Sequence, residues 1–395
     1  MRRRRRSPPA SRPRPSRPPR ARRPRRPPEP LRLLPQASTT SPVKVLVTGA
    51  TGLVGSTVAR RLLEGGHEVH ALVRDPDACD LEGARVFAGD LSSPRAIAEA
   101  AQGCDRAVHA AGEASPRSSR RALGWTNVAG TENVIRGVEH AGVERLVYIS
   151  CTDVTLHAGP RTGWNEDRIL STPPADAHGA TKLEAEEMVV GSGGRGSKGG
   201  RFETIALRPG LVWGPGPGQT IPRLCAEGLA TDGLRLYGAG RNLVAVTQAA
   251  NLAHAVVCAL QAEGAAGNVY YVVDEELTLA GEFYRELSAA LGLPAPRKSL
   301  LGLRGELAKA GLRQRFGRPG PWPSDVLRRG QSASFDPSRA INHLDYRAPV
   351  TQQEGFGILA DWVQDQGGPA ELARRARPPA DDAAVEAQIR AASGG

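Results

Sequence analysis

The stretch that decides the fold reads Thr48-Gly49-Ala50-Thr51-Gly52-Leu53-Val54-Gly55. An apolar run, Val43–Val47, precedes it, and apolar residues at helical spacing follow it. Glycine lets the backbone turn tightly and approach a pyrophosphate, while the next helix offers free N–H groups and a partial positive charge. The GxxGxxG spacing in this strand–turn–helix setting therefore predicts a phosphate-binding loop. The residues expected to contact a dinucleotide are Gly49, Thr51, Gly52, Leu53, Val54 and Gly55.

Apolar runs and helical patterns alternate beyond this loop. Strands are expected at Glu68–Val73, Arg85–Ala88, Arg106–Ala110, Arg145–Ser150 and Phe202–Arg208. The segment Trp125–Ala141 is expected to form a long helix. Alternation of this kind predicts an α/β fold, a Rossmann-type doubly wound parallel sheet whose strand order begins 3-2-1-4-5. A dinucleotide should then lie across the carboxyl ends of the strands.

Composition divides the chain into three parts. Residues 1–42 are rich in Arg and Pro, cannot build a core, and are expected to form a disordered tail. Residues 43–367 should form the Rossmann-type domain with a smaller C-terminal substrate-binding lobe, mostly 214–367, and residues 368–395 a polar, Ala-rich C-terminal tail. Because a strand begins at Val43 and a valine codon can initiate translation, we place the native start at or near this residue.

The formal net charge of +11 arises at the N-terminal end. Residues 2–32 hold 14 Arg and one acid, Glu29, which leaves 38 Lys and Arg against 40 Asp and Glu elsewhere. The rest of the chain is therefore nearly neutral. We expect no specific nucleic-acid partner, although a tether to nucleic acid or an anionic surface is the alternative function of the Arg-rich segment.

Cysteine usage and hydropathy restrict the class of protein further. The five cysteines are dispersed, which favours a reduced, cytoplasmic protein over a disulfide framework. The eight histidines form no close pair with them along the sequence, so no metal site is expected. No run of about 18 apolar residues occurs, so no membrane span is expected. The cysteines are Cys79, Cys104, Cys151, Cys225 and Cys258.

The end of the second strand bears on cofactor choice. An acid at this point favours NAD through the ribose 2′-hydroxyl, whereas a base accommodates the 2′-phosphate of NADP. Arg74 comes first after the apolar run, and Asp75 follows it. The pattern favours NADP over NAD.

Further motifs resemble the extended short-chain dehydrogenase/reductases, from Val43 to about Pro296. Gly89-Asp90-Leu91 is similar to the family's adenine-contacting turn, and Ala110-Ala111-Gly112 to the turn along the cofactor. The run from Asn127 to Val134 and the turn around Pro209 also match. The resemblance implies cofactor contacts at Asp90, Leu91, Ala110, Ala111, Gly112, Lys182 and Pro209.

Within this family the second half looks most like the 3β-hydroxysteroid dehydrogenase branch. Ile221-Pro222-Arg223-Leu224, Tyr237-Gly238-Ala239-Gly240 and Asn251-Leu252-Ala253-His254 follow one another in that branch's order. Sugar epimerases and dehydratases share most of the first half. The resemblance implies a small-molecule substrate with a hydroxyl/ketone pair.

The catalytic centre departs from the family pattern. The family uses a Tyr one helical turn before a Lys, plus a Ser after the fifth strand. Here Lys182 is in place, but His178 stands at the Tyr position and Cys151 at the Ser position. Ser150 and Thr152 flank Cys151 and could replace it only after a backbone shift. Glu184 and Glu186, on the same helix, are expected to be solvated.

His178 leaves three functions open. A neutral imidazole can accept a proton, and the Lys182 charge disfavours the imidazolium, so the pattern favours alcohol oxidation over carbonyl reduction. The leading function is an NAD(P)-dependent oxidoreductase acting on an apolar, 3β-hydroxysteroid-like molecule. The alternatives are a nucleotide-sugar epimerase or dehydratase, and a dinucleotide-binding sensor or scaffold without catalysis. By family analogy, helices near 122–141 and 178–190 would form a homodimer.

Overall fold

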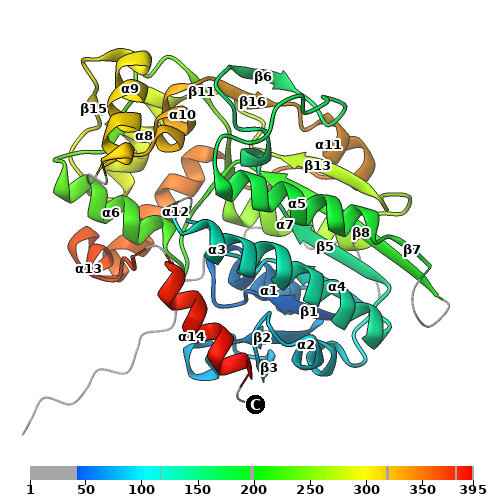
Figure 1. Cartoon of the computed structure of the whole chain (residues 1–395). Helices are drawn as coiled ribbons and strands as arrows, with labels where there is room; N and C mark the ends of the chain where they lie inside the picture. The colour runs from blue at the N-terminus through cyan, green and yellow to red at the C-terminus, as the bar shows by residue number, and fades with distance from the viewer. Residues whose placement is uncertain (1–41, 116, 196–199, 317–319, 379, 394–395) are drawn as a thin grey trace, which may run out of the picture.

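The computed structural model describes residues 42–395, apart from 116, 196–199, 317–319, 379 and 394–395 (Figure 1). The tail expected over 1–42 therefore lies almost wholly outside the described residues. Among the helices of the described part, none is both long and apolar enough to cross a membrane.

A parallel sheet forms the centre of the molecule, in the order β3-β2-β1-β4-β5-β8-β13. The expected order 3-2-1-4-5 is confirmed. A short strand, β7 (Gly194–Arg195), pairs antiparallel with β8. The parallel strands are β1 (Lys44–Thr48), β2 (Glu68–Val73), β3 (Arg85–Ala88), β4 (Arg106–His109), β5 (Arg145–Ile149), β8 (Arg201–Pro209) and β13 (Asn268–Val272).

Helices cover both faces of this sheet. The side chains of successive β1 residues therefore point into two different hydrophobic cores. Val45 and Val47 pack with Val58 of α1 (Leu53–Glu64) and Val256 of α7 (Ala249–Gln261). Leu46 packs on the opposite face. The helices of that face are α2 (Pro94–Ala101), α4 (Gly130–Ala141) and α5 (Ala177–Gly191). The expected long helix is present as α3 (Arg120–Leu123), a π-helical segment (Gly124–Ala129) and α4.

The second half of the chain is shared between the sheet and a smaller lobe. α7, β13 and α11 (Ser338–Leu344) return to the main sheet. The lobe core surrounds Trp213, whose ring lies 5.6 Å from that of Phe283 and 4.4 Å from that of Phe356. The lobe helices are α6 (Thr220–Ala230), α8 (Ala280–Ala290), α9 (Gly302–Arg315), α10 (Pro323–Gly330) and α12 (Gln352–Asp365).

Short strand pairs lie outside the main sheet, in the lobe and in the loops that border it. Their partners are β9 (Leu211–Trp213) with β12 (Val246–Gln248), β10 (Arg235–Leu236) with β15 (Arg297–Lys298), β11 (Leu243–Val244) with β14 (Thr278–Leu279), and β6 (Arg161–Trp164) with β16 (Ala333–Phe335). The last pair links the loop that precedes α5 to the end of α10.

The C-terminal segment packs against both parts of the molecule (Figure 1). α13 (Pro369–Arg374) lies on α6 of the lobe, and α14 (Asp382–Ser393) lies on α3. The Ser119 hydroxyl donates to Asp382 at 2.7 Å, and the Arg377 amide donates to the Gln219 side chain at 2.6 Å. Residues 369–386 therefore join the lobe to the edge of the Rossmann-type part.

Candidate active site

The glycine loop follows β1 and opens α1, as its sequence predicts. Gly52 is the N-cap of α1 in an extended conformation, and its amide donates to the Gly49 carbonyl at 2.9 Å. Gly49 has φ +74°, and a Cβ there would lie 2.6 Å from the Ala111 amide. A Cβ on Gly55 would lie 2.2 Å from the Gly49 carbonyl oxygen. The loop thus needs glycine at these two positions for its own backbone packing.

We expect Gly55→Ala to abolish dinucleotide binding, because the new methyl group must displace the Gly49 backbone that shapes the loop. The control is Gly311→Ala, a helical glycine of α9 whose added Cβ meets nothing within 4 Å. It should leave binding unchanged. Fluorescence titration with NADPH and chemical denaturation check both variants. Binding by Gly55→Ala at the wild-type affinity would contradict this role of the loop.

The turn after β4 lies against the glycine loop. The Ala111 amide donates to the Thr48 hydroxyl at 3.3 Å, so the two turns are joined directly. Asn127 braces the continuation of this turn, because its side chain accepts from the Glu113 amide at 2.8 Å and donates to the Glu113 carbonyl. Gly112 is part of the same turn, with the Asn127 oxygen 3.1 Å from the position of a Cβ. The sequence motif contains Asn127, but pattern alone does not reveal this bracing role.

The expected adenosine-side residues lie at the ends of β2 and β3. Arg74 is exposed directly after β2, whereas the neighbouring Asp75 caps a short turn by accepting from the Asp77 amide at 3.1 Å. The Asp90 carboxylate accepts from the Ser92 amide at 2.8 Å. Leu91 packs against Gly130, which holds this turn on the face of α4. Arg74 is thus an exposed cation at the end of β2, and no side-chain hydrogen bond or ion pair of it is found among the described residues.

His178 and Lys182 lie in the first turns of α5, beside the end of β5. Asp176 caps this helix by accepting from the Gly179 amide at 2.8 Å. A Cβ on Gly179 would lie 2.5 Å from the Asp153 carbonyl oxygen, so this glycine lets α5 approach the turn after β5. The structure thereby brings the predicted His178, Lys182 and Cys151 together.

Lys182 is buried at the end of β5. Its ammonium donates to the Ile149 carbonyl at 2.6 Å and lies 4.2 Å from the centre of the Tyr148 ring. Burial lowers the pKa of Lys182 to about 8, because the charged form loses its hydration. Tyr148 itself is a core residue.

The residues after β5 differ in their ability to bind a substrate oxygen. Burial, helped by the Asp153 charge, raises the pKa of the Cys151 thiol to about 12, so Cys151 is a protonated, weak donor at neutral pH. The buried Ser150 hydroxyl has no hydrogen-bond partner among the described residues. Thr152 is buried, and its carbonyl accepts from the Thr155 hydroxyl and from Arg161, which fixes the backbone of this turn.

Asp153 faces His178 and is held by an arginine from the lobe. The His178 Nδ1 atom lies 3.6 Å from Asp153 Oδ2, and Arg328 Nε of α10 donates to the same oxygen at 2.7 Å. Arg328 also pairs with Asp176. Burial alone would raise the pKa of Asp153, but the Arg328 guanidinium and the His178 ring bring it well below its usual range. No local sequence pattern singles out Asp153 or Arg328, because the two residues lie far apart in the chain.

This arrangement corrects the premise that no cysteine and histidine lie close together. Ligand atoms of Cys151, Asp153 and His178 all lie within 4.8 Å of one another. The fold joins the end of β5 to the first turn of α5, which sequence spacing does not reveal. The Lys182 and Arg328 cations beside the group disfavour a bound metal cation, because like charges repel.

Glu186, expected on a solvated helix face, is instead buried. It forms an ion pair with Arg208 of β8, with Arg208 Nε 2.9 Å from Glu186 Oε2, and Arg208 also donates to the Tyr271 hydroxyl at 3.1 Å. The exposed fractions of the two side chains are 9% for Arg208 and 3% for Glu186. Glu184 is exposed, as expected.

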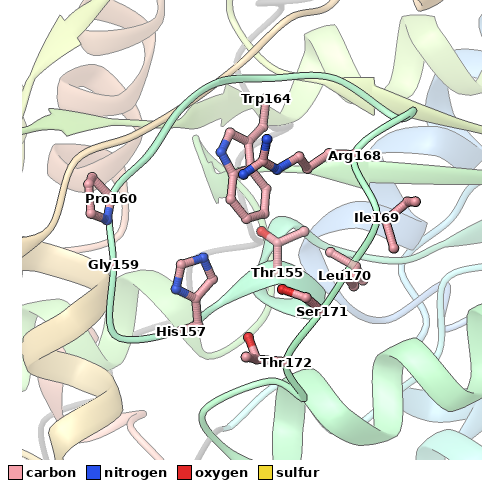
Figure 2. Close-up of a pocket in the computed structure, with 10 residues that line it drawn as sticks. All are labelled: Thr155, His157, Gly159, Pro160, Trp164, Arg168, Ile169, Leu170, Ser171 and Thr172. Atoms are coloured by element: carbon pink, nitrogen blue, oxygen red, sulfur yellow. The ribbon is translucent and has the colours of Figure 1, made fainter.

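A cavity of about 250 Å³ opens inside the loop between β5 and α5 (Figure 2). Thr155, His157, Trp164 and Arg168 point into it (Figure 2), and the Arg168 guanidinium lies 5.0 Å from the centre of the Trp164 ring. Glu166 anchors the same loop by accepting from the Tyr271 amide at 2.7 Å. Thr155 connects the cavity to the Thr152 turn beside Cys151.

Comparisons with known proteins agree with this geometry. The model of the NAD dependent epimerase/dehydratase family matches residues 45–272. A 2-alkyl-3-oxoalkanoate reductase from Stenotrophomonas maltophilia is 36% identical over 266 residues, covering 65% of this chain and 78% of the relative. A 3 beta-hydroxysteroid dehydrogenase/Delta 5-->4-isomerase from Mycobacterium tuberculosis is 30% identical over 345 residues, covering 82% of this chain and 92% of the relative.

Solved structures show the same fold. A dTDP-glucose 4,6-dehydratase from Streptomyces venezuelae with NAD bound has a TM-score of 0.64 at 22% identity, covering 82% of this chain and 98% of its own. The fold is also similar to that of a UDP-glucuronic acid 4-epimerase from Bacillus cereus in complex with UDP-glucuronic acid and NAD. The TM-score is 0.62 at 19% identity, and the match covers 81% of this chain and 99% of that one. The resemblance in the sequence motifs is confirmed, and the chain belongs to the NAD dependent epimerase/dehydratase family.

Proposed function

We propose that this protein is an NAD(P)-dependent oxidoreductase that interconverts a hydroxyl and a ketone on an apolar small molecule. The observation that supports this most is a convergence at the carboxyl ends of the strands. The glycine loop after β1, the turn after β4 and the His178–Lys182 turn of α5 meet there. The named activities of the relatives, reduction of 2-alkyl-3-oxoalkanoates and oxidation of 3β-hydroxysteroids, share this chemistry.

The residues at the crevice suit a dinucleotide. Gly49 and Gly55 let the loop backbone pack tightly at the start of α1, and the free N–H groups of this helix end suit a pyrophosphate. When bound, the dinucleotide supplies the hydride acceptor or donor. Lys182 would contact its ribose, and His178 would exchange the proton of the substrate oxygen. Of the residues after β5, Ser150 is the better donor to that oxygen, since its buried hydroxyl has no partner among the described residues.

Arg74 supports NADP as the preferred cofactor. We expect NADPH to bind more tightly than NADH, and Arg74→Ser to weaken NADPH binding by about 10- to 100-fold without changing NADH binding, because a charge-assisted hydrogen bond contributes about 1.5–3 kcal/mol. Side-by-side titrations check this, with Arg95→Ser of α2 as the control for an exposed arginine that pairs with Glu99. Equal losses of affinity for NADPH and NADH would show that Arg74 does not bind the 2′-phosphate.

A substrate panel separates the three functions. It contains 3β-hydroxysteroids with NADP⁺ or NAD⁺, 2-alkyl-3-oxo acids with NADPH or NADH, and UDP- and dTDP-sugars. Turnover of the first two classes supports the proposal. Turnover of the sugar nucleotides alone would establish an epimerase or dehydratase, and cofactor binding without any turnover would establish a sensor or scaffold.

We further propose a cytoplasmic location and a homodimer. All five cysteines of the chain are free, which suits a reducing compartment. The dimer would use α4 and α5, which pack side by side. Light scattering at several concentrations tests the dimer.

A further inference from the structure

The His178 ring has one nitrogen in an unusual position. Nδ1 is buried and has no hydrogen-bond partner among the described residues, although buried polar atoms are normally paired. The nearest carboxylate oxygen, Asp153 Oδ2, lies 3.6 Å away, just beyond hydrogen-bond distance. Catalytic hydrogen bonds are often long in ligand-free structures and shorten when substrate binds. Shortening the distance from Nδ1 to Asp153 Oδ2 by about half an ångström would complete the hydrogen bond.

Asp153 is well fixed for such a role. Arg328 donates to its Oδ2 atom at 2.7 Å and is itself held by Asp176 and Asp325. Gly179 allows α5 to approach the turn that carries Asp153. The carboxylate is therefore anchored in place and cannot rotate freely away from the imidazole. Asp153 from the turn after β5 faces the ring, Arg328 from α10 pairs with Asp153, and Lys182 follows His178 by one turn of α5.

We propose that Asp153 is a positioning residue, which holds His178 in the tautomer with the proton on Nδ1 and leaves Nε2 to exchange a proton with the substrate oxygen. This inference rests on the proposed function. The two nitrogens lie on different edges of the ring, so a carboxylate that accepts from one determines the state of the other. In a family pattern built on tyrosine no such partner is needed, because a hydroxyl has a single site for its proton.

The proton and electrons balance in both directions. In oxidation, the substrate O–H bond breaks, its proton goes to His178 Nε2, the C–H hydride leaves to the oxidised nicotinamide, and C=O forms. In reduction, the Nε2 proton goes to the ketone oxygen as hydride arrives at carbon. The Asp153 carboxylate stabilises the intervening imidazolium. Because the imidazolium occurs in both directions, the centre suits reduction as well as oxidation.

The kinetic test compares Asp153 with an exposed acid of α5. We expect Asp153→Asn to lower kcat at least about 100-fold, because an amide holds the wrong tautomer, with KM for the cofactor within twofold of wild type. Glu184→Gln is the control, since it also replaces a carboxylate by an amide, and Glu184 is an exposed residue of α5. It should keep kcat within threefold.

Double variants distinguish positioning from a general structural effect. His178→Ala with Asp153→Asn should be no slower than His178→Ala alone, because Asp153 acts through the ring. Additive losses, or an unchanged kcat in Asp153→Asn, would overturn the proposal. A kcat that EDTA abolishes would also overturn it, since a metal ion on Nδ1 excludes the proton placed there.

A second measurement does not depend on turnover. Long-range ¹H–¹⁵N NMR correlations of the histidine side chains, assigned through His178→Ala, report which ring nitrogen carries the proton. We expect an Nδ1–H form in the wild type and a shift toward Nε2–H in Asp153→Asn. An Nε2–H form in the wild type would refute the role of Asp153 even if the protein proves to be an active oxidoreductase. If no substrate is turned over, the same spectrum still tests the tautomer.

Discussion

Replacing Lys182 by methionine is expected to abolish turnover while the protein stays folded. The ammonium is a buried cation at the centre, and methionine fills a similar volume without any charge or donor. We expect kcat/KM to fall by about 1,000-fold, in line with the loss of a preorganised electrostatic group. Steady-state kinetics measure the fall, and a circular dichroism spectrum like that of the wild type shows that the fold is retained. Turnover by Lys182→Met within tenfold of wild type would show that Lys182 has no catalytic role.

The same pair of proteins gives a pH test of burial at this site. The pKa of Lys182 is about 8 in the folded protein, against an ordinary value of 10.5. Below pH 8 Lys182 is protonated in both the folded and the unfolded state. The full free-energy cost of burying its charge therefore lowers the stability of the wild type there. Between pH 8 and 10.5 the unfolded chain binds more protons, and the wild type should gain about 3 kcal/mol of stability relative to Lys182→Met. Urea denaturation at pH 7 and pH 10.5 measures the difference in free energy of unfolding between the wild type and Lys182→Met. The contributions of the other titrating groups cancel in this difference. A difference that is constant with pH would contradict the lowered pKa of Lys182.

Glu186→Gln should destabilise the protein by about 3–5 kcal/mol, because it leaves the Arg208 charge buried without its partner. Tyr271 alone cannot compensate a guanidinium that is removed from water. The control is Glu184→Gln, an exposed residue on the same helix, which should change stability by less than about 0.5 kcal/mol. Urea or guanidinium denaturation measures both.

The double variant Glu186→Leu with Arg208→Met separates lost charge pairing from lost packing. Replacing both charges by apolar side chains of similar volume should recover most of the stability. A double variant as unstable as Glu186→Gln would show that the position needs the ionic geometry itself. Retained NADPH binding in the double variant would place the pair outside the cofactor site.

Local sequence patterns predicted the sheet, because each strand and helix depends on residues close together in the chain. The glycine loop, the strand order and the positions of His178, Lys182 and Cys151 follow from such patterns. Such patterns do not predict which parts of residues 214–367 pack on the main sheet. In sequence, α7 and β13 resemble any buried helix and strand, and only the assembled sheet shows where they belong. The packing of α13 and α14 also depends on partners elsewhere in the chain.

The surroundings of the centre were the least predictable part. Arg328 reaches Asp153 across 175 positions of sequence, and no pattern near either residue indicates the other. Glu186 has the helical spacing of a solvated acid, and only the neighbouring β8 explains its burial. Ion pairs of this kind are set by the assembled fold, so sequence identified the chemical groups at the centre but not the residues that hold them.

The C-terminal segment also sets an order of events during synthesis. Asp382 follows Ser119 by 263 positions, so at about 5–20 residues per second a ribosome delivers the partner of α3 roughly 13–50 s after α3 itself. Arg328 likewise emerges long after Asp153. A nascent chain therefore has its glycine loop long before its centre is braced. A ligand that binds the folded glycine loop would stabilise the unfinished protein by mass action, before the centre is braced.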